Sequence, residues 1–77
     1  MSAVLQEIDQ ALAGYVARHQ VRPVAVYLGE RKLTQLILDV ARLGAPPTLS
    51  TAEGRPLAYR NLDLLRDEVN VDSVRVI

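Results

Sequence analysis

Residues 23–44 read PVAVYLGERKLTQLILDVARLG and predict a strand that passes through one glycine into a helix. In residues 24–28 both alternating sets of side chains are apolar, which is typical of a central strand covered on both faces. After Gly29 the apolar residues recur every three or four positions and share an arc of roughly 120° on a helix over about 30–43. They are Leu33, Leu36, Ile37, Val40 and Leu43. Gly44 ends this helix.

The composition limits the size of the core. The chain has 77 residues, which indicates a single domain over 1–77 that buries about 60% of the surface its unfolded form exposes. Hydrophobic residues make up 49% of the chain, but only 4% of residues are aromatic, and Trp and Phe are absent. The core must therefore be mainly aliphatic and the stability margin thin, which favours self-association.

Charge and cysteine content narrow the functional classes. Nine basic and nine acidic residues are interleaved along the chain and give a net charge of zero, which weighs against nucleic acid or an anionic membrane as the main partner. The absence of cysteine excludes disulfides and thiolate metal sites. No segment approaches the roughly 20 apolar residues of a membrane span, and the N-terminus does not resemble a signal peptide. We therefore expect a soluble cytoplasmic protein.

The N-terminal segment predicts a helix over about 3–20, with Ser2 as its N-cap. Its apolar residues follow a helical template for about four turns. They are Val4, Leu5, Ile8, Ala11, Leu12, Tyr15 and Val16. The small residues Ala13 and Ala17 lie on a second arc, where another backbone can approach closely; the alternative is that they only favour helix formation on a solvent-facing side.

The chain after the second helix is less regular. Residues 45–56 are rich in proline and predict a surface loop. Residues 57–77 predict a hairpin about Arg60 and Asn61 followed by a terminal strand. A short helix capped by Asn61 is the alternative for the hairpin, which is favoured because the leucines and arginines there fit a period of two.

No catalytic, cofactor-binding or metal-binding constellation is recognisable. His19, the single histidine, has no nucleophile or ligand partner at a defined spacing, so we interpret it as a cap or core-edge residue. Gly29 is one glycine rather than a Gly-rich loop, which disfavours a phosphate site at the helix start. Four carboxylates lack the order of a calcium loop and are interpreted as solvated turn charges. They are Asp63, Asp67, Glu68 and Asp72.

Two other functional classes stay open. Several basic residues of the helical half could form a nucleic-acid-binding surface if the fold brings them together. They are Arg18, Arg22, Arg31, Lys32 and Arg42. An enzyme would need a pocket that unites groups such as His19, Tyr27 and a carboxylate.

The candidate interface consists of residues that the predicted core does not use. They are Leu38, Ala41 and Thr34 on the second helix, Ala13 and Ala17 on the first, and Val74 and Val76 on the terminal strand. We predict a homodimer, and the edge of the terminal strand is its most economical route because one contact satisfies the free backbone groups. Arg75 on that strand can instead discourage pairing.

The chain resembles small proteins of tailed phages and prophages over roughly residues 24–77. The resemblance lies in the order of VYLG, a helix ending in LG, a Pro-rich loop, LAYRNL at 57–62 and a terminal Val-x-Val. Those proteins carry a strand-Gly-helix segment, a Tyr-x-Gly-hydrophobic hairpin and a terminal strand, whereas this chain has Asn61 at the turn glycine. The resemblance implies no catalytic residues and indicates a virion, accessory or other interaction protein.

These features predict an α+β domain ordered α-β-α and then two or three short strands, with both helices packed on a small mixed or antiparallel sheet. An all-helical chain outside residues 24–28 is the alternative. The predicted function is a non-enzymatic interaction or structural module without cofactor or metal, cytoplasmic or, if phage derived, in the virion. Its predicted partner is itself, as a homodimer, or another protein; a nucleic-acid-binding accessory protein and a small enzyme subunit are the alternatives.

Overall fold

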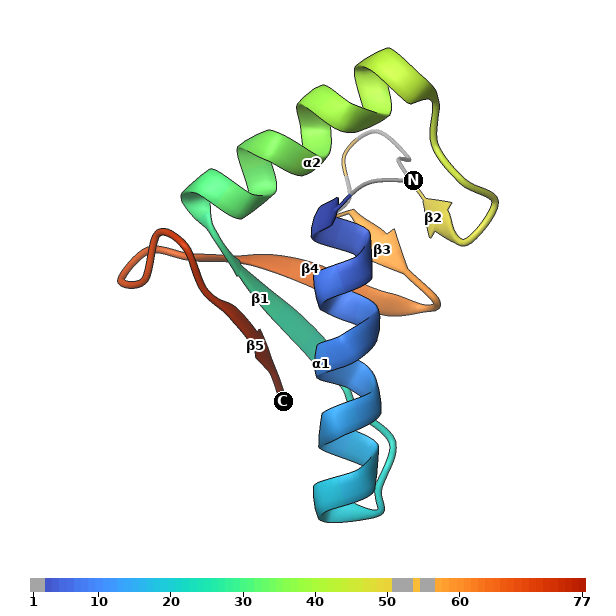
Figure 1. The fold of residues 1–77 in the computed structure, drawn as a ribbon, viewed down its shortest axis with the longest axis vertical. Helices are drawn as coiled ribbons and strands as arrows, with labels where there is room; N and C mark the ends of the chain where they lie inside the picture. The colour runs from blue at the N-terminus through green and yellow to red at the C-terminus, as the bar shows by residue number, and fades with distance from the viewer. Residues whose placement is uncertain (1–2, 51–53, 55–56) are drawn as a thin grey trace.

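The structure is a computed structural model that describes residues 3–50, 54 and 57–77. These residues form two helices and a five-stranded mixed sheet (Figure 1). The elements are α1 (Ala3–His19), β1 (Ala25–Gly29), α2 (Glu30–Leu43), β2 (Leu49–Ser50), β3 (Ala58–Tyr59), β4 (Leu62–Asp67) and β5 (Val74–Val76). The predicted α+β class is confirmed and the all-helical alternative is wrong. The predicted N-cap, Ser2, lies outside the described residues.

The strand order is β2-β3-β4-β1-β5, which places β1 inside the sheet and β5 at one edge. Strand β1 runs parallel to β4 and antiparallel to β5, and the β2-β3-β4 part is antiparallel. A parallel pair needs a long crossover connection, which α2 and the segment after it supply. The prediction that β1 is a central strand is confirmed, since it has a neighbour on each side.

Both helices pack on the same face of the sheet. Val26 and Leu28 of β1 and Leu64 of β4 lie in one buried cluster with residues of α1 and α2. Because successive strand residues point to opposite faces, Tyr27 lies on the other face, where it is only half-buried. Ala25 on that same face is buried, so the face of β1 away from the helices is only partly exposed, at Tyr27.

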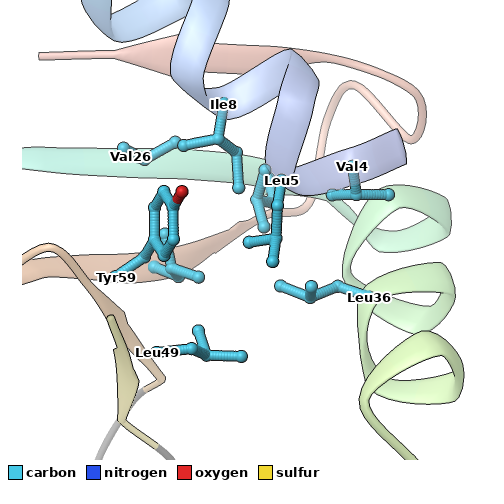
Figure 2. Packing of buried hydrophobic residues seen from close by; sticks show 9 residues of the cluster. Val4, Leu5, Ile8, Val26, Leu36, Leu49 and Tyr59 are labelled. Atoms are coloured by element: carbon cyan, nitrogen blue, oxygen red, sulfur yellow. The ribbon is translucent and has the colours of Figure 1, made fainter. Parts of the chain in front are cut away.

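The core is a cluster of buried residues from both helices and the sheet, and Tyr59 is the aromatic residue in it. Figure 2 shows Leu5 and Ile8 of α1 in the middle of the cluster, with Val26 and Tyr59 on one side and Leu36 of α2 on the other. Ile8, Val26 and Leu36 have no exposed surface. The rest of the cluster is aliphatic, as the composition predicts.

The helices bury less of their apolar faces than predicted. In α2 only Leu36 is buried, whereas Ile37 is 53% exposed and Leu43 is 68% exposed. In α1 the apolar residues Val4, Leu5 and Ile8 near its start are buried, but Val16 in the fourth turn is 46% exposed. The predicted inward positions of Ile37, Leu43 and Val16 were wrong, because each helix contacts a narrow sheet through only part of its apolar arc.

The predicted loop 45–56 contains a strand. Residues Leu49–Ser50 form β2, which pairs with β3 and buries Leu49 in the core. Two residues are too short for a periodic signal, so the prolines and small polar residues around them dominated the prediction. Residues 51–53 and 55–56 lie outside the described part of the chain.

The hairpin prediction is confirmed. Strands β3 and β4 pair antiparallel through a two-residue turn, in which Arg60 and Asn61 have φ of 53° and 65°. Positive φ at both positions is the combination of a type I′ turn, and it suits Asn better than Arg. The Tyr59 hydroxyl donates to Asp9 Oδ1 at 2.8 Å, and the same oxygen lies 3.2 Å from Arg60 Nε, so this hairpin is tied to α1.

Asp67 closes the turn between β4 and β5. Its Oδ1 accepts the backbone N–H groups of Val69 at 3.0 Å and Asn70 at 3.1 Å, and its Oδ2 lies 3.5 Å from Ser73 Oγ. The residue is 6% exposed, so the interpretation of Asp67 as a solvated turn charge was wrong. The N–H groups of Asn70 and Val69 lower the pKa of Asp67 below its ordinary value, with a smaller contribution from Arg75.

Gly29 lies where this turn crosses the start of α2. A Cβ at Gly29 would overlap the backbone of Asn70 and Val71, so only glycine allows this approach. The approach lets the Gly29 N–H donate to the Ser73 carbonyl and the Arg31 N–H donate to the Val71 carbonyl, each at 2.9 Å. One first-turn donor of α2 is thus already satisfied within the protein.

We expect Gly29→Ala to destabilise the protein by about 1–3 kcal/mol, because the added methyl group must displace backbone. The matched control is Gly14→Ala in α1, where a Cβ meets nothing within 4 Å. That change should stabilise the protein by about 0.5–1 kcal/mol through helix propensity. Urea unfolding measures both; equal effects at the two glycines would contradict the close approach.

Asp67→Asn tests the charge in the turn. The pKa of Asp67 is lower in the folded protein than in the unfolded chain, where it is about 3.9. The charged carboxylate therefore stabilises the folded protein above about pH 3.9, and this stabilisation is lost as the pH falls through the folded pKa. We expect the variant to be less stable than the wild type at neutral pH and the difference to close under acid conditions. Urea midpoints across this range measure it, with the exposed Asp72→Asn as control; the same pH dependence in both variants would contradict the assignment.

Candidate protein-binding site

The outer edge of β5 presents backbone groups to solvent. The Gly29 N–H bonds the Ser73 carbonyl, and the Ile77 N–H bonds the Ala25 carbonyl at 3.0 Å. In an antiparallel pair, hydrogen-bonded positions alternate along the strand, so Val74 and Val76 direct their N–H and C=O groups away from β1. Because β5 is an edge strand, these groups face the position that a further strand would take.

A groove runs beside this edge, between β5 and α1. It is an open hollow of about 320 Å³. Helix α1 packs against β5 and contributes residues of one face at helical spacing. The lining is Gln10, Ala11, Gly14, Tyr15, Arg18 and His19 from α1, with Val74, Arg75 and Val76 from β5. Small side chains at Ala11 and Gly14 leave room beside the strand.

The groove lining includes two arginines and one histidine. Arg18 and His19 lie at the C-terminal end of α1, and Arg75 lies on β5. The Arg75 guanidinium sits over the Tyr27 ring, 5.0 Å from its centroid, and the His19 ring lies 4.6 Å from the Tyr15 ring. The contact with Tyr27 holds the Arg75 charge beside the free edge, and the lining contains no carboxylate.

Helix α2 carries a second candidate surface, which we call the outer arc and define as Thr34, Ile37, Leu38 and Ala41. All four are exposed, with Leu38 at 52%. At 100° per residue they span about 100° of the helix, next to the buried arc. Val71 lines a hollow with Thr34 at the N-terminal end of the outer arc and is 47% exposed.

The seven predicted interface residues fall on three separate surfaces. Val74 and Val76 border the groove, whereas Thr34, Leu38 and Ala41 lie on the outer arc. Ala13 and Ala17 lie on the side of α1 opposite the groove and line a shallow hollow. Its other lining residues are Asp9, Leu12, Val16 and Arg60.

The groups that an enzyme would need are not brought together. His19 lines the groove, while Tyr27 lies on the sheet face without helices. Among the described residues no group of three histidine or acidic side chains is placed to hold a metal ion. The same part of the chain has no helix with the length and apolar content needed to cross a bilayer.

The basic residues considered for nucleic acid also lie apart. Arg31 pairs with Asp72 at 3.5 Å and Lys32 pairs with Glu7 at 2.7 Å, both at the start of α2. Arg42 lies in the last turn of α2, and Arg18 in the last turn of α1. This arrangement does not produce the single excess of positive charge that a phosphate backbone requires.

Sequence reasoning missed two parts of the candidate surfaces. Ile37 was assigned to the core, although the spacing of Thr34, Ile37, Leu38 and Ala41 already forms a coherent second arc. Gly14 was placed on the small-residue arc of the first helix and Arg18 among the scattered basic residues, but the sequence did not predict the groove, because only the packing of β5 beside α1 makes them neighbours of a strand edge.

Comparison with protein-family models, curated proteins and solved structures found no match to this chain. The function of the chain is therefore inferred from its own residues and geometry.

Proposed function

We propose that the protein is a non-enzymatic interaction module that self-associates as a homodimer through α2. The observation that carries the proposal is the outer arc, where Ile37 and Leu38 are each about half exposed on a helix whose neighbouring arc already packs in the core. Adjacent exposed apolar side chains of this kind mark interaction sites. A 77-residue chain with few aromatic residues also gains stability from covering them.

The outer arc is self-complementary. Along α2 it reads small, large, large, small, as Thr34, Ile37, Leu38 and Ala41. A second copy in antiparallel orientation brings Thr34 against Ala41 and Ile37 against Leu38, and the reverse pairs follow by two-fold symmetry. The small residues at both ends let the helix axes approach while the large ones fill the centre.

The charges at the ends of α2 suit the antiparallel arrangement. Glu30 lies in the first turn and Arg42 in the last turn. An antiparallel pair places each Glu30 within about one turn of the other copy's Arg42, which brings opposite charges together at both ends. Arg31, at the same end as Glu30, is already paired with Asp72. Such surface ion pairs contribute little to the affinity of the dimer, but they favour the antiparallel orientation of the two helices.

A homodimer through α2 also agrees with an accessory role. The resemblance to small tailed-phage proteins supports a structural or assembly module, acting in the cytoplasm or in the virion. The enzyme alternative gains no support, because His19 lines the groove while Tyr27 lies on the other sheet face. The nucleic-acid alternative gains none, because Arg31 and Lys32 are paired with carboxylates.

Leu38→Glu should shift the monomer-dimer equilibrium toward monomer, raising the dissociation constant about tenfold or more, because the carboxylate would be buried against apolar residues. Sedimentation equilibrium across micromolar to millimolar concentrations measures it. The matched control is Leu43→Glu, because Leu43 is 68% exposed on the same helix but about 140° away from Leu38. This control should associate like the wild type.

Three outcomes would contradict the proposal. They are a monomeric wild type at all concentrations, equal weakening by Leu38→Glu and Leu43→Glu, and loss of the dimer on Val76→Pro rather than on Leu38→Glu. The last outcome would move the homodimer contact to the edge of β5.

A further inference from the structure

We infer that the β5 edge and its groove bind an extended, acidic segment of another protein as an added strand. The surface is distinct from the outer arc, since its residues come from β5 and from α1 rather than α2. The inference therefore does not depend on the homodimer.

The outward backbone groups of β5 can form hydrogen bonds with an added strand. Val74 and Val76 each direct one N–H and one C=O outward, which matches the hydrogen-bond pattern that a further strand presents. Peptides bound by strand addition gain affinity from such main-chain bonds and specificity from alternate side chains. The partner segment must therefore be extended rather than helical.

The groove limits which side chains of the partner segment can fit on the side that faces α1. In an added strand, alternate residues would point toward the helix layer, beside Val74 and Val76, where Ala11 and Gly14 leave a hollow of about 320 Å³. Tyr15 forms its wall. The rest of the lining is largely polar, but the side chains of an added strand that lie beside Val74 and Val76 would meet these two valines and the small residues Ala11 and Gly14. Cross-strand contact with the valines favours apolar residues at these positions of the partner.

Charge determines which side chains of the partner segment suit the opposite sheet face. The remaining residues of the added strand would lie on the opposite sheet face, beside Arg75, which is exposed over Tyr27. Arg18 adds positive charge at the end of the groove, on the side of α1. Opposite charges directly across a strand pair are stabilising, so these positions of the partner should be Asp or Glu.

A second copy fits this site poorly. Antiparallel pairing of two β5 strands centred on Arg75 uses the outward groups of Val74 and Val76, but it places Arg75 directly opposite the same residue of the other copy. The self-pairing considered from the sequence therefore carries a like-charge cost at its centre. This cost favours a partner of opposite charge.

The test links an alternating Val-Glu segment to Ile77 through a flexible Gly/Ser linker, which holds it at a millimolar effective concentration. Amide hydrogen exchange then reports the outward N–H groups. We expect exchange at Val74 and Val76 to slow about tenfold or more relative to the untailed chain. A matched tail with Lys in place of Glu should give much less protection.

Two variants make the test specific. Val76→Pro removes an outward N–H without removing a bond to β1, so it should abolish the added protection at Val74 while the Arg75 amide, which faces β1, stays protected. Arg75→Glu should reduce the difference between the Glu and Lys tails. Four outcomes would overturn the inference. They are equal protection by both tails, no protection by either tail, protection that survives Val76→Pro, and a difference between the tails that Arg75→Glu leaves unchanged. Concentration-dependent protection without a tail would also overturn it, by assigning the edge to a second copy.

Discussion

The turn that Asp67 closes over Gly29 is the constraint on which the positions of β5 and α2 both depend. One carboxylate organises the turn through two backbone N–H groups, and the absence of a side chain at Gly29 lets that turn reach the start of α2. The carbonyl of Val71 then receives the Arg31 N–H, while the carbonyl of Ser73 begins the pairing of β5 with β1. A single local structure thereby joins a helix start to a sheet edge.

The placement of both helices on one face explains why so much apolar surface is exposed. A single sheet face cannot cover the full apolar arcs of two helices, so Val16, Ile37 and Leu43 remain outside the core. The core itself is small and depends on complete burial of a few residues, among them Ile8, Val26 and Leu36. Surfaces for other chains arise as a consequence of this limited packing.

The two proposed interfaces use different physics. The outer arc of α2 offers apolar side chains with a symmetric order of sizes, which suits an identical helix. The β5 edge offers backbone hydrogen bonds with positive charge beside them, which suits a different, acidic chain. Since they lie on separate elements, the same molecule can use both surfaces at once.

Sequence reasoning worked where one local pattern decides the structure. The apolar run through Tyr27, the helical spacing around Leu36 and the turn preference of Asn61 located β1, α2 and the β3-β4 hairpin. It failed for Asp67, which resembles any solvated turn carboxylate until its turn is folded, and for β2, whose two residues carry no period.

The amino-acid sequence by itself determined both helices, the β3-β4 hairpin and the central place of β1, because these follow from side-chain periodicity and local turn preference. The need for glycine at position 29 comes from tertiary structure, since it is the backbone of Asn70 and Val71 that leaves no room for a Cβ there. Tertiary structure decided which helix residues are buried, that β5 forms an edge beside α1, and that two arginines and one histidine line one groove. Those features depend on contacts between segments far apart in the chain, such as α1 and β5, and no local pattern encodes such a contact.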